Sequence, residues 1–290
     1  MMRYAVIGAA GQLGQEFPKH LPRESFLPLD LEELDVRSLD SVRACLSRLE
    51  FDAAINLAAF HQVDKCEDEP EPTFLVNSAG AANVARVCRE LGRRTCFFST
   101  DYVFGADAGR RTPYLEGDPP GPLSIYGASK LAGEHLTLAL NPGSVVIRTS
   151  SLYGVVTSRK GSTFPEKMIQ KARAGEPLKV VDDQTMSPTY TFDLASRTIA
   201  ILEKRGEGIF HVTGGEGCTW WEFASEAIRL AGMDVKVEKT TAAAFAAKAK
   251  RPAYSRLDSR RFGELGIDPM PHWRDALRRY LKEKGLLAGR

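Results

Sequence analysis

Tyr126 and Lys130 have side chains and a spacing that could support acid–base chemistry. They lie four residues apart in the segment SIYGASKLAGE, residues 124–134, and on a helix this spacing places both on one face. A phenol is a poor acid or base at neutral pH because its pKa is about 10. A neighbouring ammonium ion favours the phenolate and lowers that pKa. The pattern predicts a tyrosine that exchanges a proton with a ligand; a surface pair on a helix is the alternative.

A second group of hydroxyl-bearing residues follows a short apolar run. The segment FFSTDYVFG, residues 97–105, places Ser99 and Thr100 just after the expected strand Thr95–Phe98. Ligands of parallel α/β sheets bind beyond the carboxyl ends of the strands. A hydroxyl there can hydrogen-bond a carbonyl oxygen on which charge develops. Thr100 or Ser99 is therefore a candidate partner of Tyr126.

Glycines mark the turn after the first apolar run. Gly8, Gly11 and Gly14 in GAAGQLG follow the expected strand Tyr4–Ile7 and open a predicted helix. Such a turn lets the backbone approach a pyrophosphate, which then lies at the helix N-terminus. Asp30 follows the second expected strand, where a carboxylate accepts from the adenosine ribose hydroxyls. We expect a dinucleotide site that tolerates NADH and repels the 2′-phosphate of NADPH, unless arginines elsewhere compensate; a glycine turn that binds nothing is the alternative.

Short apolar runs alternate with helix-like segments through the first half of the chain. Buried runs separated by helices indicate a parallel sheet covered on both faces. We therefore predict an α/β fold with a Rossmann-type, doubly wound parallel sheet. Strands are expected at Tyr4–Ile7, Ser25–Leu29, Ala53–Leu57, Thr95–Phe98 and Ser144–Arg148, and a helix at Ser78–Leu91.

The pattern changes after residue 150. We expect residues 1–150 to form the NAD(P)-binding domain, with about 185–212 returning to it, and residues 151–290 to form mainly a smaller C-terminal α/β substrate-binding domain. The last segment holds 12 Lys and Arg against 5 Asp and Glu over residues 248–290. This excess indicates either a solvated face or a pocket for a diphosphate. Helices are predicted at Phe164–Ala174 and along a stripe of Trp273, Leu277, Tyr280 and Leu281.

The composition excludes several classes of protein. Hydrophobic residues make up 43% and charged residues 26% of the 290 residues, which is a globular composition. A net charge of +2 provides no basic surface for nucleic acid. There is no apolar run of about 18 residues to span a membrane, and the five cysteines lack disulfide or zinc spacing. We expect a cytoplasmic protein without nucleic-acid or membrane partners, and a homodimer is a possible assembly.

Several segments together carry a resemblance to a known family. They are GAAGQLG, residues 56–70 (NLAAFHQVDKCEDEP), STDYVFG, YGASKLAGE, and the late Asp183-Gln184 and Pro188-Thr189. These segments resemble the dTDP-4-dehydrorhamnose reductase family of the extended short-chain dehydrogenase/reductase superfamily. The resemblance runs from residue 3 to about residue 200 and thins beyond it, where Arg251-Pro252 and Leu257-Asp258 still fit. It implies NADH- or NADPH-dependent reduction of the 4-keto group of dTDP-4-dehydro-L-rhamnose to dTDP-L-rhamnose.

The resemblance also implies a role for each matching residue. Tyr126 is the implied proton donor, Lys130 holds the nicotinamide ribose and lowers the pKa of the tyrosine, and Thr100 orients the keto oxygen. The implied cofactor site runs from the pyrophosphate through the ribose and adenine to the substrate junction, and consists of Gly8, Gly11, Gln12, Leu13, Gly14, Asp30, Asp35, Val36, Ala58, Ala59, Phe60, His61, Tyr126 and Lys130. The implied contacts of the dTDP-sugar are Thr100, Asp101, Ser151, Tyr153 and Arg251.

One position within STDYVFG separates reactions inside the superfamily. In sugar-nucleotide 4,6-dehydratases the matching segment reads Thr-Asp-Glu, and its carboxylates perform the elimination as acid and base. Tyr102 stands at the Glu position here, so reduction is expected. The alternatives are a non-catalytic regulatory subunit resembling that of methionine adenosyltransferase, and an NAD-dependent sugar-nucleotide epimerase or dehydratase.

The expected sugar pocket departs from the family pattern. Ser151 stands where many members have a Trp, and His61 where a Thr is common, so the exact deoxysugar is left open. Arg251 is the first candidate for the diphosphate, its alternative role being a structural partner of a carboxylate, and Lys160 or Arg159 come next. Glu16 and other carboxylates form no ligand cluster, so no metal is expected.

Overall fold

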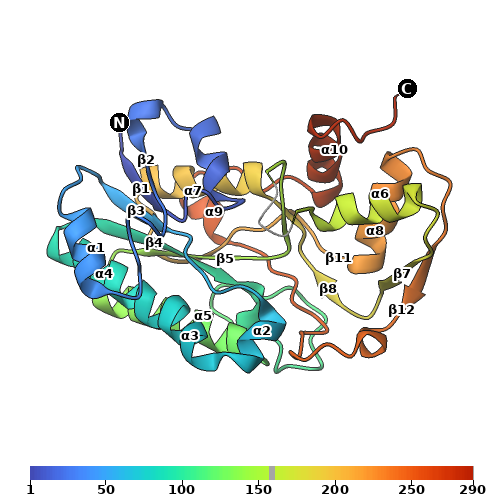
Figure 1. The fold of residues 1–290 in the computed structure, drawn as a ribbon, viewed down its shortest axis with the longest axis horizontal. Coiled ribbons are helices and arrows are strands. Elements are labelled where there is room, and N and C mark those ends of the chain that lie inside the picture. The colour runs from blue at the N-terminus through green and yellow to red at the C-terminus, as the bar shows by residue number, and fades with distance from the viewer. Residues whose placement is uncertain (157–160, 290) are drawn as a thin grey trace.

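The computed structural model describes residues 1–156 and 161–289. A six-stranded sheet forms the centre of the part that contains the N-terminus (Figure 1). Every neighbouring pair of strands in this sheet is parallel. From the strand that comes first in the sequence, the second strand is added on one side and the third on the other. Ligands of doubly wound sheets bind at this change of direction. Across the sheet the strands are β10 (Gly208–His211), β5 (Val145–Thr149), β4 (Arg94–Thr100), β3 (Ala53–Asn56), β1 (Tyr4–Ile7) and β2 (Phe26–Leu29).

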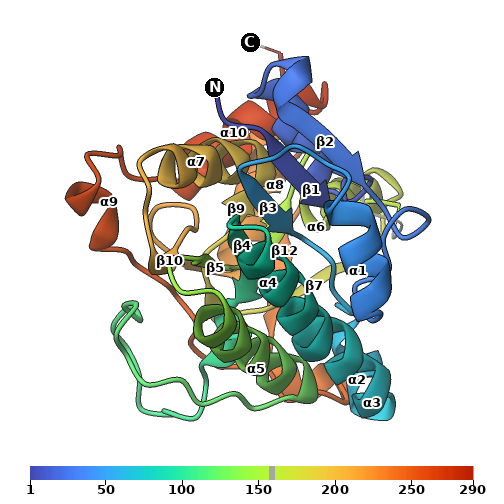
Figure 2. The same cartoon turned by 90° about the vertical axis from the view of Figure 1, so that its left-hand side faces the viewer.

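Helices cover both faces of the sheet, so the predicted fold class is confirmed (Figure 2). Alternate residues of β1 belong to different clusters: Tyr4 and Val6 pack toward one face, Ala5 and Ile7 toward the other. That alternation is the two-residue period of a strand. One face carries η1 (Gly14–Lys19) and α7 (Thr191–Glu203); the other carries α1 (Leu39–Leu46), α4 (Gly80–Glu90) and α5 (Ile125–Leu140).

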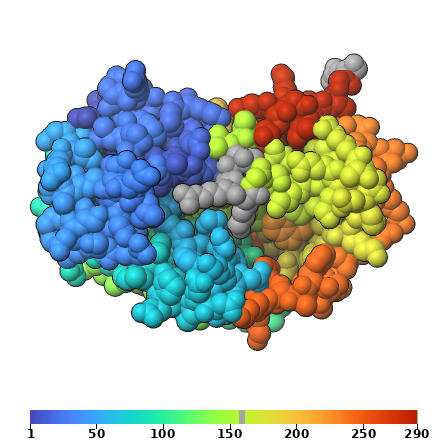
Figure 3. All heavy atoms as spheres, viewed as in Figure 1, coloured from blue at the N-terminus to red at the C-terminus, as the bar shows by residue number. Residues whose placement is uncertain are grey.

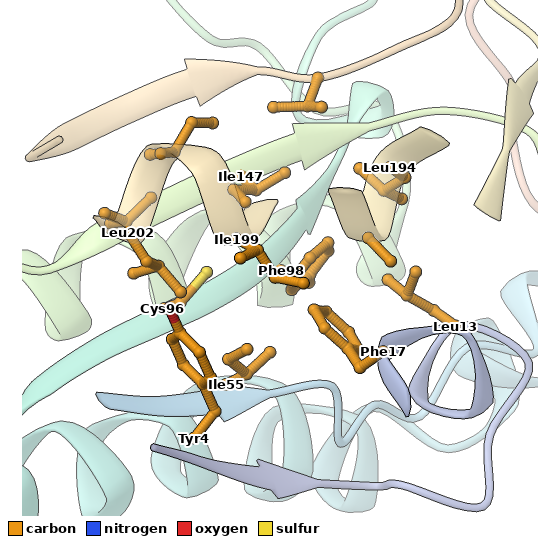
Figure 4. Close-up of a cluster of buried hydrophobic side chains, with 14 of the residues drawn as sticks. Tyr4, Leu13, Phe17, Ile55, Cys96, Phe98, Ile147, Leu194, Ile199 and Leu202 are labelled. Carbon is orange, nitrogen blue, oxygen red and sulfur yellow. The ribbon is translucent and has the colours of Figure 1, made fainter. Parts of the chain in front are cut away.

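The cluster under α7 shows how residues far apart in the sequence form one core (Figure 4). Tyr4 and Ile55 project from the sheet, Phe17 from η1, and Leu194 and Leu202 from α7. Each of these five side chains is fully buried. Burying a large apolar side chain contributes roughly 1.5–3 kcal/mol to the free energy of folding. These contacts therefore stabilise the packing of α7 against the sheet.

Two of the expected elements differ from the sequence-based prediction. The helix after the glycine loop is the short 3-10 helix η1 with Pro18 inside it, because proline has no N–H to continue a longer helix. The helix expected at Ser78–Leu91 begins earlier, as the π-helix η3 (Leu75–Ala79), and continues into α4. The predicted strands are all present, with ends shifted by at most two residues.

A second core fills the C-terminal part of the chain. Its centre is aromatic, with Tyr153, Tyr190, Phe223, Trp273 and Tyr280 all buried. The predicted stripe of the last helix, which includes Trp273 and Tyr280, is confirmed as a buried face. The helices here are α6 (Phe164–Arg173), α8 (Trp220–Leu230) and α10 (Trp273–Glu283), and short strands pair as β6 (Leu152–Tyr153) with β9 (Thr189–Tyr190), β7 (Leu178–Val181) with β12 (Val237–Thr240), and β8 (Thr185–Met186) with β11 (Cys218–Thr219).

An ion pair and a hydrogen bond connect the two parts of the molecule. Lys19 of η1 lies 3.3 Å from Glu283 of α10, which also accepts a 2.6 Å hydrogen bond from the Tyr190 hydroxyl. Figure 3 shows the N-terminal residues in blue and cyan and the later residues in yellow-green and orange, with a hollow between the two groups. The boundary at residue 150 and the substrate-binding role of the second part stay predictions. The remaining elements are α2 (Val63–Asp68), α3 (Pro70–Phe74), α9 (Arg261–Glu264), η2 (Arg23–Ser25), η4 (Asp101–Val103) and η5 (Ala242–Phe245).

None of the helices within residues 1–156 and 161–289 has the length and apolar character needed to cross a membrane.

A substitution at Gly133 of α5 would test how tightly this helix packs against its neighbours. A Cβ at this position would lie 2.4 Å from the backbone oxygen of Asn77 and 2.7 Å from the ring of Phe97. We expect Gly133→Ala to lower the free energy of unfolding by about 1–3 kcal/mol through overpacking, measured by urea denaturation. The matched control is Gly263→Ala in α9, where a Cβ meets nothing within 4 Å and should be neutral or slightly stabilising. Equal effects of the two substitutions would contradict close packing of α5.

Candidate active site

The first turn of α5 lies directly against the segment that follows β4. Ser124 caps the helix, because its hydroxyl accepts from the backbone N–H of Gly127 at 3.2 Å. A Cβ on Gly127 would lie only 2.2 Å from the backbone oxygen of Tyr102, so a glycine is needed for this approach. As a result the Tyr126 hydroxyl lies beside the side chain of Thr100, and the rings of Tyr126 and Tyr102 meet edge to face at 6.1 Å.

Tyr126 keeps its proton in this environment. Burial raises the pKa of Tyr126 above its ordinary value, and the neighbouring Thr100 hydroxyl opposes this only in part. The charge of Asp101 raises the pKa further. Lys130 is not among the groups that shift the pKa of Tyr126, so the lowering of this pKa by Lys130 stays a prediction. A protonated phenol is the form that an acid catalyst requires.

Lys130 is a buried cation that lacks a hydrogen-bond acceptor within the described part of the chain. Its side chain lies under the surface, with Nζ 4.1 Å from the centre of the Phe97 ring. Burial lowers the pKa of Lys130 to about 7, and the carboxylate of Glu134 opposes this shift. An ammonium group with free donors fits a ligand that brings hydroxyl oxygens, such as a ribose.

Asp101 and Thr100 form a hydrogen-bonded group at the end of β4. The Thr100 hydroxyl donates to Asp101 at 3.2 Å, and the Ser255 hydroxyl donates to its other oxygen at 2.5 Å. Burial raises the pKa of Asp101 to about 6, although these hydroxyls oppose the shift. Ser255 belongs to the C-terminal segment, so this contact fastens that segment to the carboxyl end of β4.

A small pocket lies next to Asp101. Its volume is about 10 Å³, close to that of one water molecule. Asp101 and Ser151 of the predicted substrate contacts line it, and Ser151 has a strained positive φ of 47°. The sequence-based prediction missed the other walls, because they come from separate later segments and carry no local pattern: Gln184, Thr185, Met186, Trp220, Pro252 and Ser255.

The glycine loop has the geometry of an anion cradle. Gly8 has a φ of +84°, and a Cβ on Gly14 would lie 2.5 Å from the backbone oxygen of Ala9. The backbone N–H groups of Gln12 and Leu13 find no acceptor among the described residues, so they are free to bind a phosphate. The residues present therefore fit the pyrophosphate of a dinucleotide.

Asp30 lies beside this loop. Its carboxylate oxygens accept from the backbone N–H of Ala10 at 3.0 and 3.1 Å. An open groove of about 310 Å³ lies next to it, on the side of the sheet that carries η1. The groove is lined by Ala9, Ala10, Gln15, Pro18, Phe26, Pro28 and Asp30.

The remaining predicted cofactor contacts follow β2 and β3. Asp35 forms an ion pair with Arg37, 2.7 Å apart, which lowers the pKa of the carboxylate. Val36 is buried beneath Gly80, where a Cβ would approach it to 2.8 Å. Further along, a loop after β3 carries Ala58, Ala59, Phe60 and the exposed His61.

Asn77 of the π-helix η3 holds that loop in place. Its amide accepts from the Phe60 N–H at 2.8 Å, donates to the Phe60 oxygen at 3.0 Å, and donates to Ser129 of α5 at 3.0 Å. The loop and the helix that carries Lys130 are thereby fixed to each other. A π-helical turn is a known marker of functional segments, but spacing alone did not indicate it here.

Of two further predicted substrate contacts, Tyr153 lies away from this group and Arg251 lies beside Tyr102. Tyr153 is 1% exposed and packs within the second aromatic core. Arg251 forms an ion pair with Asp64, 2.8 Å apart, and lies beside the Tyr102 phenol; a carboxylate partner was the alternative that the sequence left open. Arg159 and Lys160 lie outside the described residues. Throughout residues 1–156 and 161–289, no three His, Cys, Asp or Glu side chains group as metal ligands would.

Comparison with known proteins places this geometry in a family. The family described as "RmlD substrate binding domain" matches residues 2–285. A dTDP-4-dehydrorhamnose reductase of Streptomyces griseus is 38% identical over 284 residues, which cover 95% of this chain and 91% of that protein. The chain belongs to the dTDP-4-dehydrorhamnose reductase family.

Two further members of the wider group show its range. A probable dTDP-4,6-dihydroxy-2-methyloxan-3-one 4-ketoreductase of Streptomyces antibioticus is 39% identical, with 96% of this chain and 94% of that protein covered. The crystal structure of dTDP-4-dehydrorhamnose reductase from Bacillus anthracis, in complex with NADP, has a TM-score of 0.91 and 34% identity and covers 97% of this chain and 99% of that one. Family membership thus extends over nearly the whole chain.

The low pKa of Lys130 predicts that this residue makes the free energy of unfolding depend on pH. The folded pKa of about 7 lies below the unfolded value of about 10.4, so the folded state binds fewer protons between these values. Stability relative to Lys130→Met should therefore rise from pH 7 to pH 9 by about 1.4 kcal/mol per pH unit, and stay level below pH 7. Urea unfolding of both proteins across this range measures it. Parallel stability curves would show that Lys130 titrates normally.

Proposed function

We propose that this protein catalyses the NAD(P)H-dependent reduction of the 4-keto group of a dTDP-4-dehydro-6-deoxysugar. The favoured reaction converts dTDP-4-dehydro-L-rhamnose to dTDP-L-rhamnose. The observation that supports it best is that Tyr126 lies beside Thr100 and one helical turn from Lys130, in a chain of this reductase family. That group provides a proton donor, a carbonyl partner and a cation at the carboxyl end of β4.

The reaction adds a hydride to the carbonyl carbon and a proton to its oxygen. When bound, the reduced nicotinamide supplies the hydride. Tyr126 retains its proton because of burial, and we assign it the proton that neutralises the alkoxide forming at O4. Thr100 donates a hydrogen bond to the same oxygen, where negative charge develops. Lys130 contacts the nicotinamide ribose with donors that no described residue uses.

We assign the cofactor to the residues that the sequence predicts. We assign the pyrophosphate to Gly8, Gly14 and the N–H groups of Gln12 and Leu13, with Gly11 between them. The ribose is assigned to Asp30, and the adenine to Asp35 and Val36. The loop Ala58 to His61 stands at the junction with the substrate, where Asn77 fixes its backbone. The B. anthracis relative carries NADP, and we include both NADH and NADPH as cofactors.

The sugar nucleotide is assigned to the hollow between the two cores. Asp101 and Ser151 lie at the pocket beside Thr100. Arg251 would have to exchange Asp64 for the diphosphate, and its guanidinium is partly exposed and able to do so. Tyr153 is left out of this assignment because it is enclosed by the second core. A cytoplasmic location and a homodimer also stay predictions.

The chemistry and the burial of the Tyr102 side chain disfavour an elimination reaction. An elimination needs a carboxylate at this position to remove a carbon-bound proton. Burial instead raises the pKa of the Tyr102 phenol, although Arg251 lies beside it and opposes the shift. A neutral phenol is a weak base, so reduction is favoured over a dehydratase reaction.

An oxidation assay of NADH and NADPH with enzymatically prepared dTDP-4-dehydro-L-rhamnose tests the proposal. The product is identified by mass and NMR. Consumption of cofactor with formation of dTDP-L-rhamnose supports it. Cofactor binding without turnover of any dTDP-4-keto-6-deoxysugar would favour the regulatory-subunit alternative.

Tyr126→Phe removes the assigned proton donor while keeping the ring. We expect the turnover number to fall by about 10²–10⁴-fold, the usual contribution of a general acid, with the dissociation constant of NADH nearly unchanged. Tyr4→Phe is the control, because it deletes a buried phenol that has no partner in the described structure and lies far from the site. A loss of less than about tenfold would mean that another group donates the proton.

Asp30 is expected to govern the choice of cofactor. Removing its charge and adding a cation, as in the double variant Asp30→Ala/Leu31→Arg, should raise kcat/KM for NADPH relative to NADH, since the 2′-phosphate loses a like charge and gains a partner. Leu31 is 65% exposed and can accept the change. Glu32→Ala, which deletes a nearby exposed carboxylate, is the control for net charge. An unchanged cofactor ratio in the double variant would place Asp30 away from the ribose.

A further inference from the structure

Glu134 is a buried carboxylate one helical turn beyond Lys130. Its side chain is 2% exposed, and it accepts from Nε and Nη2 of Arg148 at 2.9 and 2.7 Å. The hydroxyl of Ser99 also donates to it. Glu134 is therefore fixed in position by groups from two strands, β4 and β5.

Arg148 is the second cation that shares this carboxylate. Its side chain is 3% exposed, and Nη1 lies 3.4 Å from Nε2 of His211 on β10. Burial lowers the pKa of His211 to about 4, so the ring is neutral. The backbone oxygens of Tyr114 and Asp258 lie 3.1 and 3.0 Å from Nδ1, so Nδ1 carries the proton and Nε2 accepts from Arg148.

The charges around Lys130 are few and can be named. On its own helix stand Glu134 and the neutral Tyr126; β5 contributes Arg148 and β10 the neutral His211. Facing side chains from β4 and η3 are uncharged, namely Phe97, Ser99 and Asn77, while Asp101 of η4 lies next to Tyr126. Of these groups, only Glu134 acts on the charge of Lys130. One carboxylate thus serves two buried cations.

We propose that Glu134 is a positioning residue of the reaction, which keeps Lys130 protonated, and that Arg148 sets how much of the Glu134 charge Lys130 feels. This inference rests on the proposed role of Lys130 at the nicotinamide ribose, because only a charged lysine has all three donors. Glu134 itself touches neither the substrate nor the cofactor in this assignment. It acts through Lys130.

Removing Glu134 and removing Arg148 should shift the titration of Lys130 in opposite directions. Without Glu134, Lys130 and Arg148 are two cations with no carboxylate between them, so Lys130 loses its proton at lower pH. Without Arg148, the full negative charge of Glu134 falls on Lys130, so Lys130 loses its proton at higher pH. A purely structural pair would lower stability in both variants but would not move the titration of Lys130 in opposite directions.

Lysine NMR of the free protein measures this directly. The protein is labelled with ¹³C-lysine, and the Lys130 signal is identified by its loss in Lys130→Met. We expect its titration midpoint to fall by about one pH unit or more in Glu134→Gln and to rise by a similar amount in Arg148→Gln. Arg148→Lys, which keeps a cation beside Glu134, should restore most of the original midpoint. Glu90→Gln, which deletes an exposed carboxylate of α4 that pairs with Arg43 of α1, should change nothing.

The same variants are then titrated with NADH across pH. The pH at which the dissociation constant begins to rise should move with the Lys130 midpoint in each variant. Midpoints that move in the same direction, or not at all, would overturn the proposal. If Glu134→Gln does not fold, the rise in Arg148→Gln and its reversal in Arg148→Lys decide the question. Because the NMR arm uses no ligand, it can succeed even if the reductase assay fails, which separates this inference from the proposed function.

Discussion

The site depends on how closely α5 approaches β4 and the turn that follows it. Gly127 and Gly133 face the backbone oxygens of Tyr102 and Asn77 at distances that leave no room for a Cβ. This contact brings the first turn of α5 over the end of the sheet, where Thr100 stands. A helix only slightly further away would separate the Tyr126 and Thr100 hydroxyls. The absence of a side chain at Gly127 and Gly133 therefore lets α5 bring Tyr126 to Thr100.

Close packing also has an electrostatic consequence, because it excludes water from the same helix face. Lys130, Glu134 and Arg148 are all buried there, and an isolated charge in such a place is costly. The pairing of Glu134 with Arg148 compensates both of those charges, whereas Lys130 has only a share of one carboxylate. The protein thus carries a cation that is incompletely compensated until a ligand provides oxygen atoms.

The sequence predicts the sheet well because buried parallel strands are uniformly apolar, as in Tyr4–Ile7 and Ser144–Arg148. It predicts less well what depends on distant partners. Periodicity did not reveal that Pro18 shortens the helix after the glycine loop, and spacing could not show that burial dominates the pKa of Tyr126. Trp220 and the other late pocket walls have no local pattern, since only the fold brings them beside Asp101.

The hydrogen-bond directions explain how the site can be ready before a substrate arrives. Thr100 donates to Asp101 and accepts from the Tyr102 N–H, so its remaining lone pair is available to the Tyr126 hydroxyl. Ser255 holds the other oxygen of Asp101 from the C-terminal segment. Asp101 therefore accepts the hydroxyl hydrogen of Thr100 in the free protein, and in the proposed reaction a carbonyl oxygen would replace it. Neither hydroxyl has to move far for this exchange, because rotation about each C–O bond redirects the hydrogen. Reduction of a ketone needs just such a pair of donors converging on one oxygen.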